Sequence, residues 1–197
     1  MIESEQITDD YSGQDGRPDV IATKDTIVMV GLMGAGKTAI GRRLAGRLEL
    51  PFVDADDEIE AAAGSSINDI FERLGEASFR DGERRVIARL LDGPAIVLAT
   101  GGGAFMDAQT RERIAAKGVS VWLRTDIDTL VRRTSRREDR PLLRSGDPRE
   151  ILLHLMEQRY PIYQLADIVV DSLDAPAEDT LQQVLNALEA YRAAEKA

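Results

Sequence analysis

Residues 31–38 read Gly31-Leu32-Met33-Gly34-Ala35-Gly36-Lys37-Thr38. They fit the phosphate-binding loop pattern G-x-x-x-x-G-K-[ST] and lie between a predicted strand (26–30) and a predicted helix (36–48). Glycines there let backbone N–H groups surround a polyphosphate, and the helix N-terminus adds partial positive charge. The pattern predicts that Lys37 reaches the β- and γ-phosphates and that the Thr38 hydroxyl binds Mg²⁺. The stretch therefore predicts a nucleotide site, and the alternative is a glycine-rich turn that fits by chance.

Short apolar runs alternate with helical patterns along the rest of the chain. The predicted strands are 26–30, 51–54, 95–100, 119–124 and 167–170, and the predicted helices are about 36–48, 57–63, 66–74, 77–91, 107–117, 126–137, 148–158 and 177–194. Two helices carry end signals, because Asp107 is an N-cap residue with Gly118 beyond the other end, and Asp147 precedes Pro148. Strands nearly continuous in Val, Ile and Leu are typical of a parallel sheet covered by helices on both faces, so the sequence predicts an α/β fold.

The composition excludes several function classes. The 197 residues suit one domain with a sizeable core, and the absence of cysteine excludes disulfides, thiolate metal sites and a cysteine nucleophile. The net charge of −10 argues against general nucleic-acid binding. No apolar run approaches membrane-spanning length, and the N-terminus lacks the basic and apolar regions of a signal peptide. We therefore expect a cytoplasmic protein that binds neither nucleic acid nor membranes.

Charge is distributed unevenly along the chain. Residues 1–25 hold seven acidic side chains against two basic ones and show almost no apolar periodicity, which predicts a disordered acidic tail ahead of one domain at 26–197. Residues 132–149 hold seven arginines and no lysine. In an acidic protein such a cluster favours bidentate recognition of phosphate or carboxylate, although a solvated basic helix face accounts for about half of these arginines.

Acidic residues and glycines gather where the predicted strands end, at the edge of a parallel sheet where ligands bind. Asp54 and Asp56 end the second strand two residues apart, so both carboxylates can face one side of a cleft. One could hold Mg²⁺ and the other could orient or deprotonate an attacking hydroxyl, and the alternative is a pair of solvated loop acids. Gly101-Gly102-Gly103 follows the third strand, which favours close approach of a ligand to the backbone over a plain turn.

Two arginines are candidates for binding an anionic substrate. Arg80 and Glu83 are three residues apart near the start of a predicted helix and share a face, so Glu83 can fix the guanidinium. Arg159 ends another predicted helix. Taken alone, either arginine also fits an ordinary surface position.

From residue 27 to about residue 170 the chain resembles the shikimate kinase family. The resemblance rests on the order and spacing of motifs that are mostly weak singly. They are residues 31–38, Asp54-Ala55-Asp56, Ser66-Ile67-Asn68-Asp69-Ile70-Phe71, Gly75-Glu76, Phe79-Arg80, Gly101-Gly102-Gly103, Arg140-Pro141-Leu142-Leu143 and Arg159-Tyr160. The resemblance implies a five-stranded parallel sheet flanked by helices, in a three-layer sandwich of the P-loop nucleoside-monophosphate-kinase type. It also implies a substrate-binding helical subdomain at about 54–91 and a lid at about 134–147.

The resemblance implies a reaction as well: ATP and Mg²⁺ are used to phosphorylate the 3-hydroxyl of shikimate in aromatic amino-acid biosynthesis. By position, the implied ATP-binding residues are Gly34, Ala35, Gly36, Lys37, Thr38, Ala39, Arg133 (stacked on adenine) and Arg140. The implied Mg²⁺ ligands are Thr38 and Asp54. The implied shikimate-binding residues are Asp56, Phe71, Phe79, Arg80, Glu83, Gly101, Gly102, Gly103 and Arg159. Lys37, Arg140 and Asp56 are implied to be catalytic, with Asp56 acting on the attacking hydroxyl.

Two other functions compete with this interpretation. Gluconate kinase is also a small phosphate-loop enzyme that acts on a polyhydroxy acid, but Gly101–Gly103 and Phe79-Arg80 speak against it. A nucleotide-binding regulatory module without catalysis is opposed by the presence of both Lys37 and Asp56. The expected partners are therefore ATP and shikimate, on a monomeric chain.

Overall fold

The centre of the molecule is a five-stranded parallel sheet. In the computed structural model, which describes residues 26–135 and 146–195, its strands are β1 (Thr26–Val30), β2 (Phe52–Asp54), β3 (Val97–Ala99), β4 (Gly118–Arg124) and β5 (Ile168–Asp171). Their order is β2-β3-β1-β4-β5, and every neighbouring pair is parallel. All five predicted strands are confirmed, each within two residues of its expected bounds.

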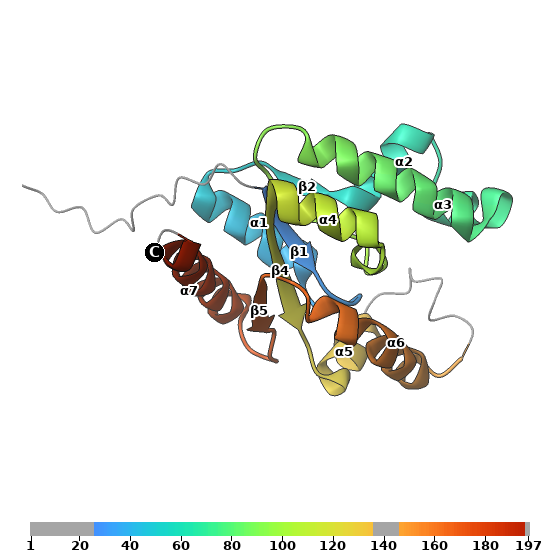
Figure 1. Ribbon diagram of the computed structural model, residues 1–197. Helices are drawn as coiled ribbons and strands as arrows, with labels where there is room; N and C mark the ends of the chain where they lie inside the picture. Colours follow the sequence, from blue (N-terminus) through green and yellow to red (C-terminus); the bar gives the residue numbers. More distant parts are fainter. Residues whose placement is uncertain (1–25, 136–145, 196–197) are drawn as a thin grey trace, which may run out of the picture.

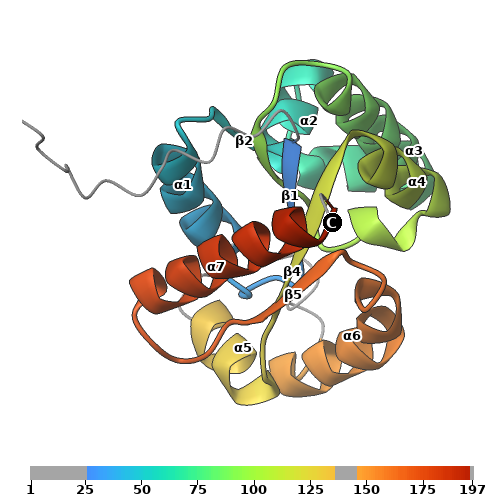
Figure 2. The ribbon, with the colours of Figure 1, turned by 60° about the vertical axis from the view of Figure 1, so that its left-hand side comes forward.

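Helices cover both faces of this sheet, as the apolar strands predict (Figure 1). On one face α1 (Lys37–Leu48) lies beside α7 (Ala177–Glu195), and on the other α4 (Ala108–Lys117) packs against β4 (Figure 2). The middle strand β1 is buried along its whole length, since its neighbours on both sides and helices on both faces exclude water. The result is the expected three-layer sandwich.

The longest helix, α3 (Ile67–Leu91), contains a break where the sequence predicts two separate helices. Gly75 has φ 80° and ψ 169°, outside the helical region, so the segments before and after it meet at a kink. A side chain rarely adopts this positive φ, which explains a glycine here. Together with α2 (Ala55–Ala63), this helix forms a second, smaller apolar cluster around Ile59 and Phe79.

Helix α6 (Pro148–Tyr163) is longer than the sequence predicts. Asp147 caps its first turn as expected, by accepting a hydrogen bond from the Arg149 N–H. The predicted end at 158 is wrong, because the helix continues to Tyr163 with Pro161 inside it, at the cost of one backbone hydrogen bond in its last turn. Arg159 therefore lies within the helix, one turn before Tyr163.

The remaining elements are short. They are the 3₁₀ turn η1 (Ala104–Met106) and helix α5 (Ile127–Thr134). The predicted tail at 1–25 and most of the predicted lid, including Arg140, fall outside the described residues. In the part of the chain that the structure describes, no helix is long and apolar enough to cross a membrane.

Candidate functional site

The glycine-rich loop after β1 has the backbone shape that its sequence requires. Gly34 and Gly36 have φ values of 83° and 102°, and a Cβ on Gly34 would lie 2.9 Å from the Thr134 side chain. Lys37 begins α1, and its Nζ donates to the carbonyls of Gly31 (2.9 Å) and Leu32 (3.0 Å). The loop thus holds an ammonium group beside a helix N-terminus, a combination suited to polyphosphate.

Arg133 ties this loop to the segment that follows β5. Its Nη1 lies 3.4 Å from the Ala35 carbonyl and 3.1 Å from the Ser172 hydroxyl, and its Nη2 donates to the Leu173 carbonyl at 2.7 Å. The Ser172 hydroxyl donates to the same Ala35 carbonyl at 3.0 Å. Arg133 therefore lies at the glycine-rich loop, with hydrogen bonds that fix its guanidinium. Ser172 was missed, because a lone serine after a strand carries no sequence signal.

Thr38 and Asp54 meet across the gap between α1 and β2. The Thr38 hydroxyl donates to Asp54 Oδ2 at 3.0 Å. The other oxygen of Asp54 accepts from the Asp56 N–H at 3.2 Å and so caps α2. A hydroxyl and a carboxylate side by side, next to a phosphate loop, are the oxygen donors that Mg²⁺ uses together with substrate phosphates. The two predicted metal ligands therefore fit the ion.

Asp56, in the first turn of α2, is the carboxylate with the most perturbed titration in the site. Burial and then the charge of Asp54 raise the pKa of Asp56 to about 6, while the charge of Lys37 opposes this shift. The charge of Glu83 also raises the pKa of Asp56, by a smaller amount. A carboxylate with a pKa near neutrality is a better proton acceptor than an ordinary aspartate.

The glycine run after β3 is closely surrounded by charged side chains. A Cβ on Gly101 would lie 2.9 Å from Glu83 Oε1 and 3.0 Å from Asp56 Oδ1. A Cβ on Gly103 would collide with the Arg80 guanidinium. Side chains from α2 and α3 therefore approach the backbone of this run so closely that residues with side chains would be crowded there.

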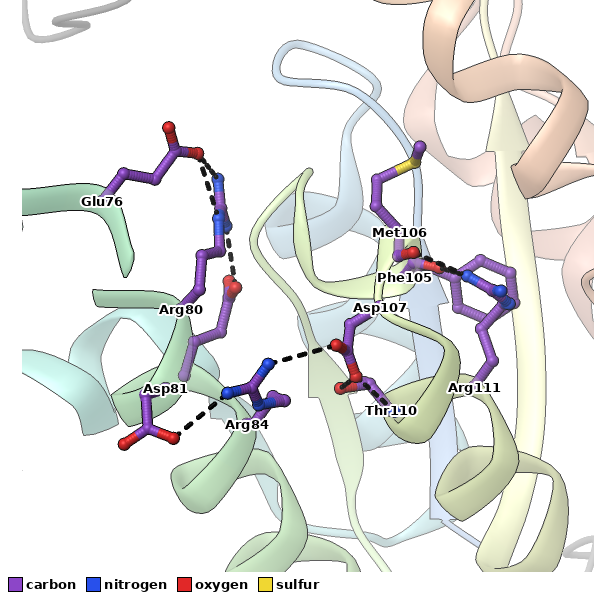
Figure 3. A network of polar contacts seen from close by, with 10 residues as sticks. Glu76, Arg80, Asp81, Arg84, Phe105, Met106, Asp107, Thr110 and Arg111 are labelled. Atoms are coloured by element: carbon purple, nitrogen blue, oxygen red, sulfur yellow. Dashed lines mark hydrogen bonds and ion pairs between the residues drawn. The ribbon is translucent and has the colours of Figure 1, made fainter. Parts of the chain in front are cut away.

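Arg80 is held by two carboxylates on its own helix. Its Nη1 lies 2.7 Å from Glu83 Oε2, and its Nη2 lies 3.4 Å from Glu76 Oε1 (Figure 3). The Glu83 side chain is only 4% exposed; burial raises its pKa, and the Arg80 charge opposes that shift. Apolar rings line the same helix, since Phe71 and Phe79 lie 4.6 Å apart and Arg80 lies over Phe79. The predicted interaction of Glu83 with the guanidinium is present.

A second ion-pair chain joins α3 to α4. Arg84 Nη2 lies 3.1 Å from Asp81, and its Nη1 lies 3.3 Å from Asp107, which caps α4 by accepting from the Thr110 N–H (Figure 3). The sequence identified Asp107 only as a helix cap. Its pairing with Arg84 was missed, because the two residues are remote in sequence and only the fold brings them together.

Arg159, on α6, also lies close to the glycine run. A Cβ on Gly102 would lie 3.1 Å from Arg159 Nη1. The charge of Arg159 also contributes to lowering the pKa of Glu83, after the larger effects of burial and Arg80. Two arginines from different elements, Arg80 and Arg159, thus both lie at the glycine run. Of the predicted site residues, Ala39 is exposed in the first turn of α1, and Arg140 lies outside the described residues.

Comparison with known proteins identifies chains of similar sequence. The family model described as shikimate kinase matches residues 33–189. A protein of Paramagnetospirillum magneticum named shikimate kinase is 64% identical over 171 residues, which cover 87% of this chain and 88% of that protein. One from Bradyrhizobium diazoefficiens with the same name is 56% identical over 172 residues, which cover 87% and 83%.

Solved structures agree with these similarities. The shikimate kinase of Acinetobacter baumannii in complex with shikimate superposes with a TM-score of 0.81 at 40% identity, covering 85% of this chain and 94% of that one. A gluconokinase from Sinorhizobium meliloti reaches a TM-score of 0.61 at 19% identity, covering 88% and 95%. At that identity the second similarity concerns the fold alone.

Proposed function

The chain belongs to the shikimate kinase family, and we propose that the site described above transfers the γ-phosphoryl group of ATP to the 3-hydroxyl of shikimate. The proposed residue roles rest on one observation. Side chains from three helices come together at the glycine run, namely Asp56, Arg80 and Arg159. A phosphate loop follows the adjacent strand, so donor and acceptor sites share one edge of the sheet.

On the donor side, Gly34 to Ala39 bind the phosphates through backbone N–H groups, and Lys37 neutralises charge on the transferred group. Arg133 binds the nucleotide at the adenine end. Arg140 adds a second positive charge, a role that rests on the family resemblance alone. Thr38 and Asp54 would hold Mg²⁺, which supplies further charge neutralisation at the β- and γ-phosphates.

On the acceptor side, Arg80 and Arg159 bind the shikimate carboxylate, since two guanidinium groups fix both its position and its plane. Glu83 holds Arg80 in place, Phe71 and Phe79 form the apolar wall, and Gly101–Gly103 contact the ring through their backbone. The region around 54–91 thereby serves as the substrate-binding part of the domain.

Asp56 acts on the hydroxyl that attacks. As the bond from the shikimate oxygen to the γ-phosphorus forms and the bond to the leaving ADP oxygen breaks, the hydroxyl proton passes to the Asp56 carboxylate. The raised pKa of about 6 suits this transfer, because the group is ionised at neutral pH and still basic enough to take the proton.

The test is release of ADP with shikimate, gluconate, quinate and no acceptor in parallel. We expect turnover with shikimate and little with the other three. Turnover with gluconate and not with shikimate would contradict the proposal. We also propose that the chain acts as a monomer in the cytoplasm, where ATP is available.

A further inference from the structure

Tyr163 ends α6 and is fully buried, one helical turn beyond Arg159. Its ring packs against Trp122 and Phe105, with ring centroids 5.8 Å and 6.4 Å away. An aromatic ring held in this way leaves its hydroxyl in a fixed place. The position of that hydroxyl is therefore set by the core of the protein.

The hydroxyl joins two parts of the substrate site. It donates a hydrogen bond to the carbonyl of Gly102, in the middle of the glycine run. The Arg159 guanidinium lies at the same glycine, since a Cβ on Gly102 would lie 3.1 Å from Arg159 Nη1 and 3.7 Å from the Tyr163 hydroxyl oxygen. The Tyr163 hydroxyl and the Arg159 guanidinium thus meet at Gly102.

The hydroxyl keeps its proton under working conditions. Burial raises the pKa of Tyr163 to about 12, and the charge of Arg159 opposes the shift without cancelling it. A protonated hydroxyl can always donate to Gly102, so the connection persists across the physiological pH range.

Tyr160, on the same helix, provides the comparison. Its hydroxyl donates to the carbonyl of Thr125, which follows β4 and has no role in shikimate binding as proposed here. Both tyrosines satisfy a backbone carbonyl, but only the carbonyl that Tyr163 bonds, that of Gly102, belongs to the acceptor site. If the Tyr163 hydroxyl had a purely structural role, its removal would have the same kind of effect as removal of the Tyr160 hydroxyl.

We propose that Tyr163 is a positioning residue for the acceptor: it holds the Gly102 backbone in place beside the Arg159 guanidinium, so that both meet shikimate together. The inference rests on the proposed role of Arg159 in binding the carboxylate. It predicts that Tyr163 sets the affinity for shikimate and leaves ATP binding unchanged, since its hydroxyl bonds to Gly102, on the acceptor side of the site.

The test compares Tyr163→Phe with Tyr160→Phe as the matched control. Each variant removes one hydroxyl and leaves one carbonyl without its donor. We expect Tyr163→Phe to raise KM for shikimate about tenfold, which is the loss of one buried hydrogen bond to a binding group. Its kcat and its affinity for ATP should stay within about twofold of wild type. Tyr160→Phe should lower the melting temperature to a similar degree without changing KM for shikimate.

A double substitution separates positioning from packing. If Tyr163 acts through Arg159, then Tyr163→Phe should add little to the KM of Arg159→Lys, because neighbouring residues in one network are not additive. Full additivity, or an unchanged KM in Tyr163→Phe, would overturn the inference. An equal rise in KM for Tyr160→Phe would overturn it as well.

Two further measurements keep the outcome clear. The wild-type protein assayed with shikimate tests the proposed function itself. If the wild type is inactive with shikimate, the proposed function is contradicted. If the wild type is active and Tyr163→Phe leaves KM for shikimate unchanged, only the inference is contradicted. If Tyr163→Phe does not fold, Gly102→Ala is the second variant, because it alters the contact between Gly102 and Arg159. Its methyl would lie 3.1 Å from Arg159 Nη1 and should raise KM for shikimate with ATP affinity preserved; an unchanged KM would overturn the inference.

Discussion

Glu83 Oε2 lies 2.7 Å from Arg80 Nη1, while the second oxygen of the same buried carboxylate faces Gly101. A buried carboxylate is costly unless it is paired, so Glu83 and Arg80 hold each other in place. Glu83 accepts from Nη1 and Glu76 accepts from Nε and Nη2, so one N–H on each terminal nitrogen of Arg80 remains for an anion at the glycine run. The position of the arginine is therefore set before any substrate arrives.

This relationship predicts different effects for the two glutamates that contact Arg80. Glu83→Gln should raise KM for shikimate about 10- to 100-fold, because Arg80 loses its buried charged partner and its fixed orientation. Glu76→Gln should change KM less than about twofold, since Glu76 is 68% exposed and its pair with Arg80 is longer. Steady-state kinetics with saturating ATP measure both. Equal effects of the two substitutions would contradict the role of Glu83.

Asp56→Asn tests the proton acceptor. We expect kcat to fall about 10²- to 10⁴-fold, the usual contribution of a general base, while ATP affinity measured without acceptor stays near wild type. Asp57→Asn is the control, because Asp57 is the adjacent exposed acid of the same helix. A kcat for Asp56→Asn close to that of wild type would remove Asp56 from its proposed role.

The raised pKa of Asp56 predicts a dependence of stability on pH. Its value of about 6 in the folded chain exceeds the ordinary 3.8, so the folded state binds the proton more tightly, and stability is lost as pH rises from 4 through 6. Asp56→Asn should therefore stabilise the protein by about 1–3 kcal/mol at pH 7, and this gain should vanish below pH 4. Chemical denaturation at the two pH values measures it. A gain that is equal at both pH values would rule out ionisation as the cause.

Asp54→Asn separates metal binding from helix capping. Asparagine caps a helix as well as aspartate does, so the free energy of unfolding should change little. The Mg²⁺ concentration that gives half-maximal activity should rise about tenfold or more, because an amide oxygen is a weaker ligand for a hard cation than a carboxylate. Titration of activity with Mg²⁺ at constant ATP is the measurement. An unchanged requirement for Mg²⁺ would exclude Asp54 as a ligand.

Most of the fold could be predicted from the sequence, because the buried parallel strands are short continuous apolar runs and the phosphate loop fixes where the first strand ends. The end of α6 could not, since a proline in a last turn looks the same in sequence as a proline that stops a helix. The contacts of Tyr163 and Arg84 could not be predicted from the sequence either. Both join elements distant in the chain, and only tertiary packing brings Tyr163 to Gly102 or Arg84 to Asp107.

The two arginines that lie at the glycine run give the most specific prediction, because it tests the acceptor and not only the nucleotide fold. Arg80→Ala should weaken shikimate binding by about 2–4 kcal/mol, the scale for removing one side of a desolvated charge pair. Arg159→Lys should also raise KM for shikimate, since an ammonium cannot reproduce the planar two-point contact of a guanidinium. Neither change should alter ATP binding measured without acceptor.

The control for this prediction changes the substrate instead of the protein. A shikimate analogue whose carboxylate is replaced by a neutral amide should be a poor acceptor for wild type, because the guanidinium groups of Arg80 and Arg159 would lose the charge they pair with. The two variants should lose little more than wild type does with this analogue, since the interaction they lack is already missing. If wild type phosphorylated the amide as well as it does shikimate, the arginines would not bind the carboxylate, and the orientation of the acceptor would have to come from the glycine run and Asp56 alone.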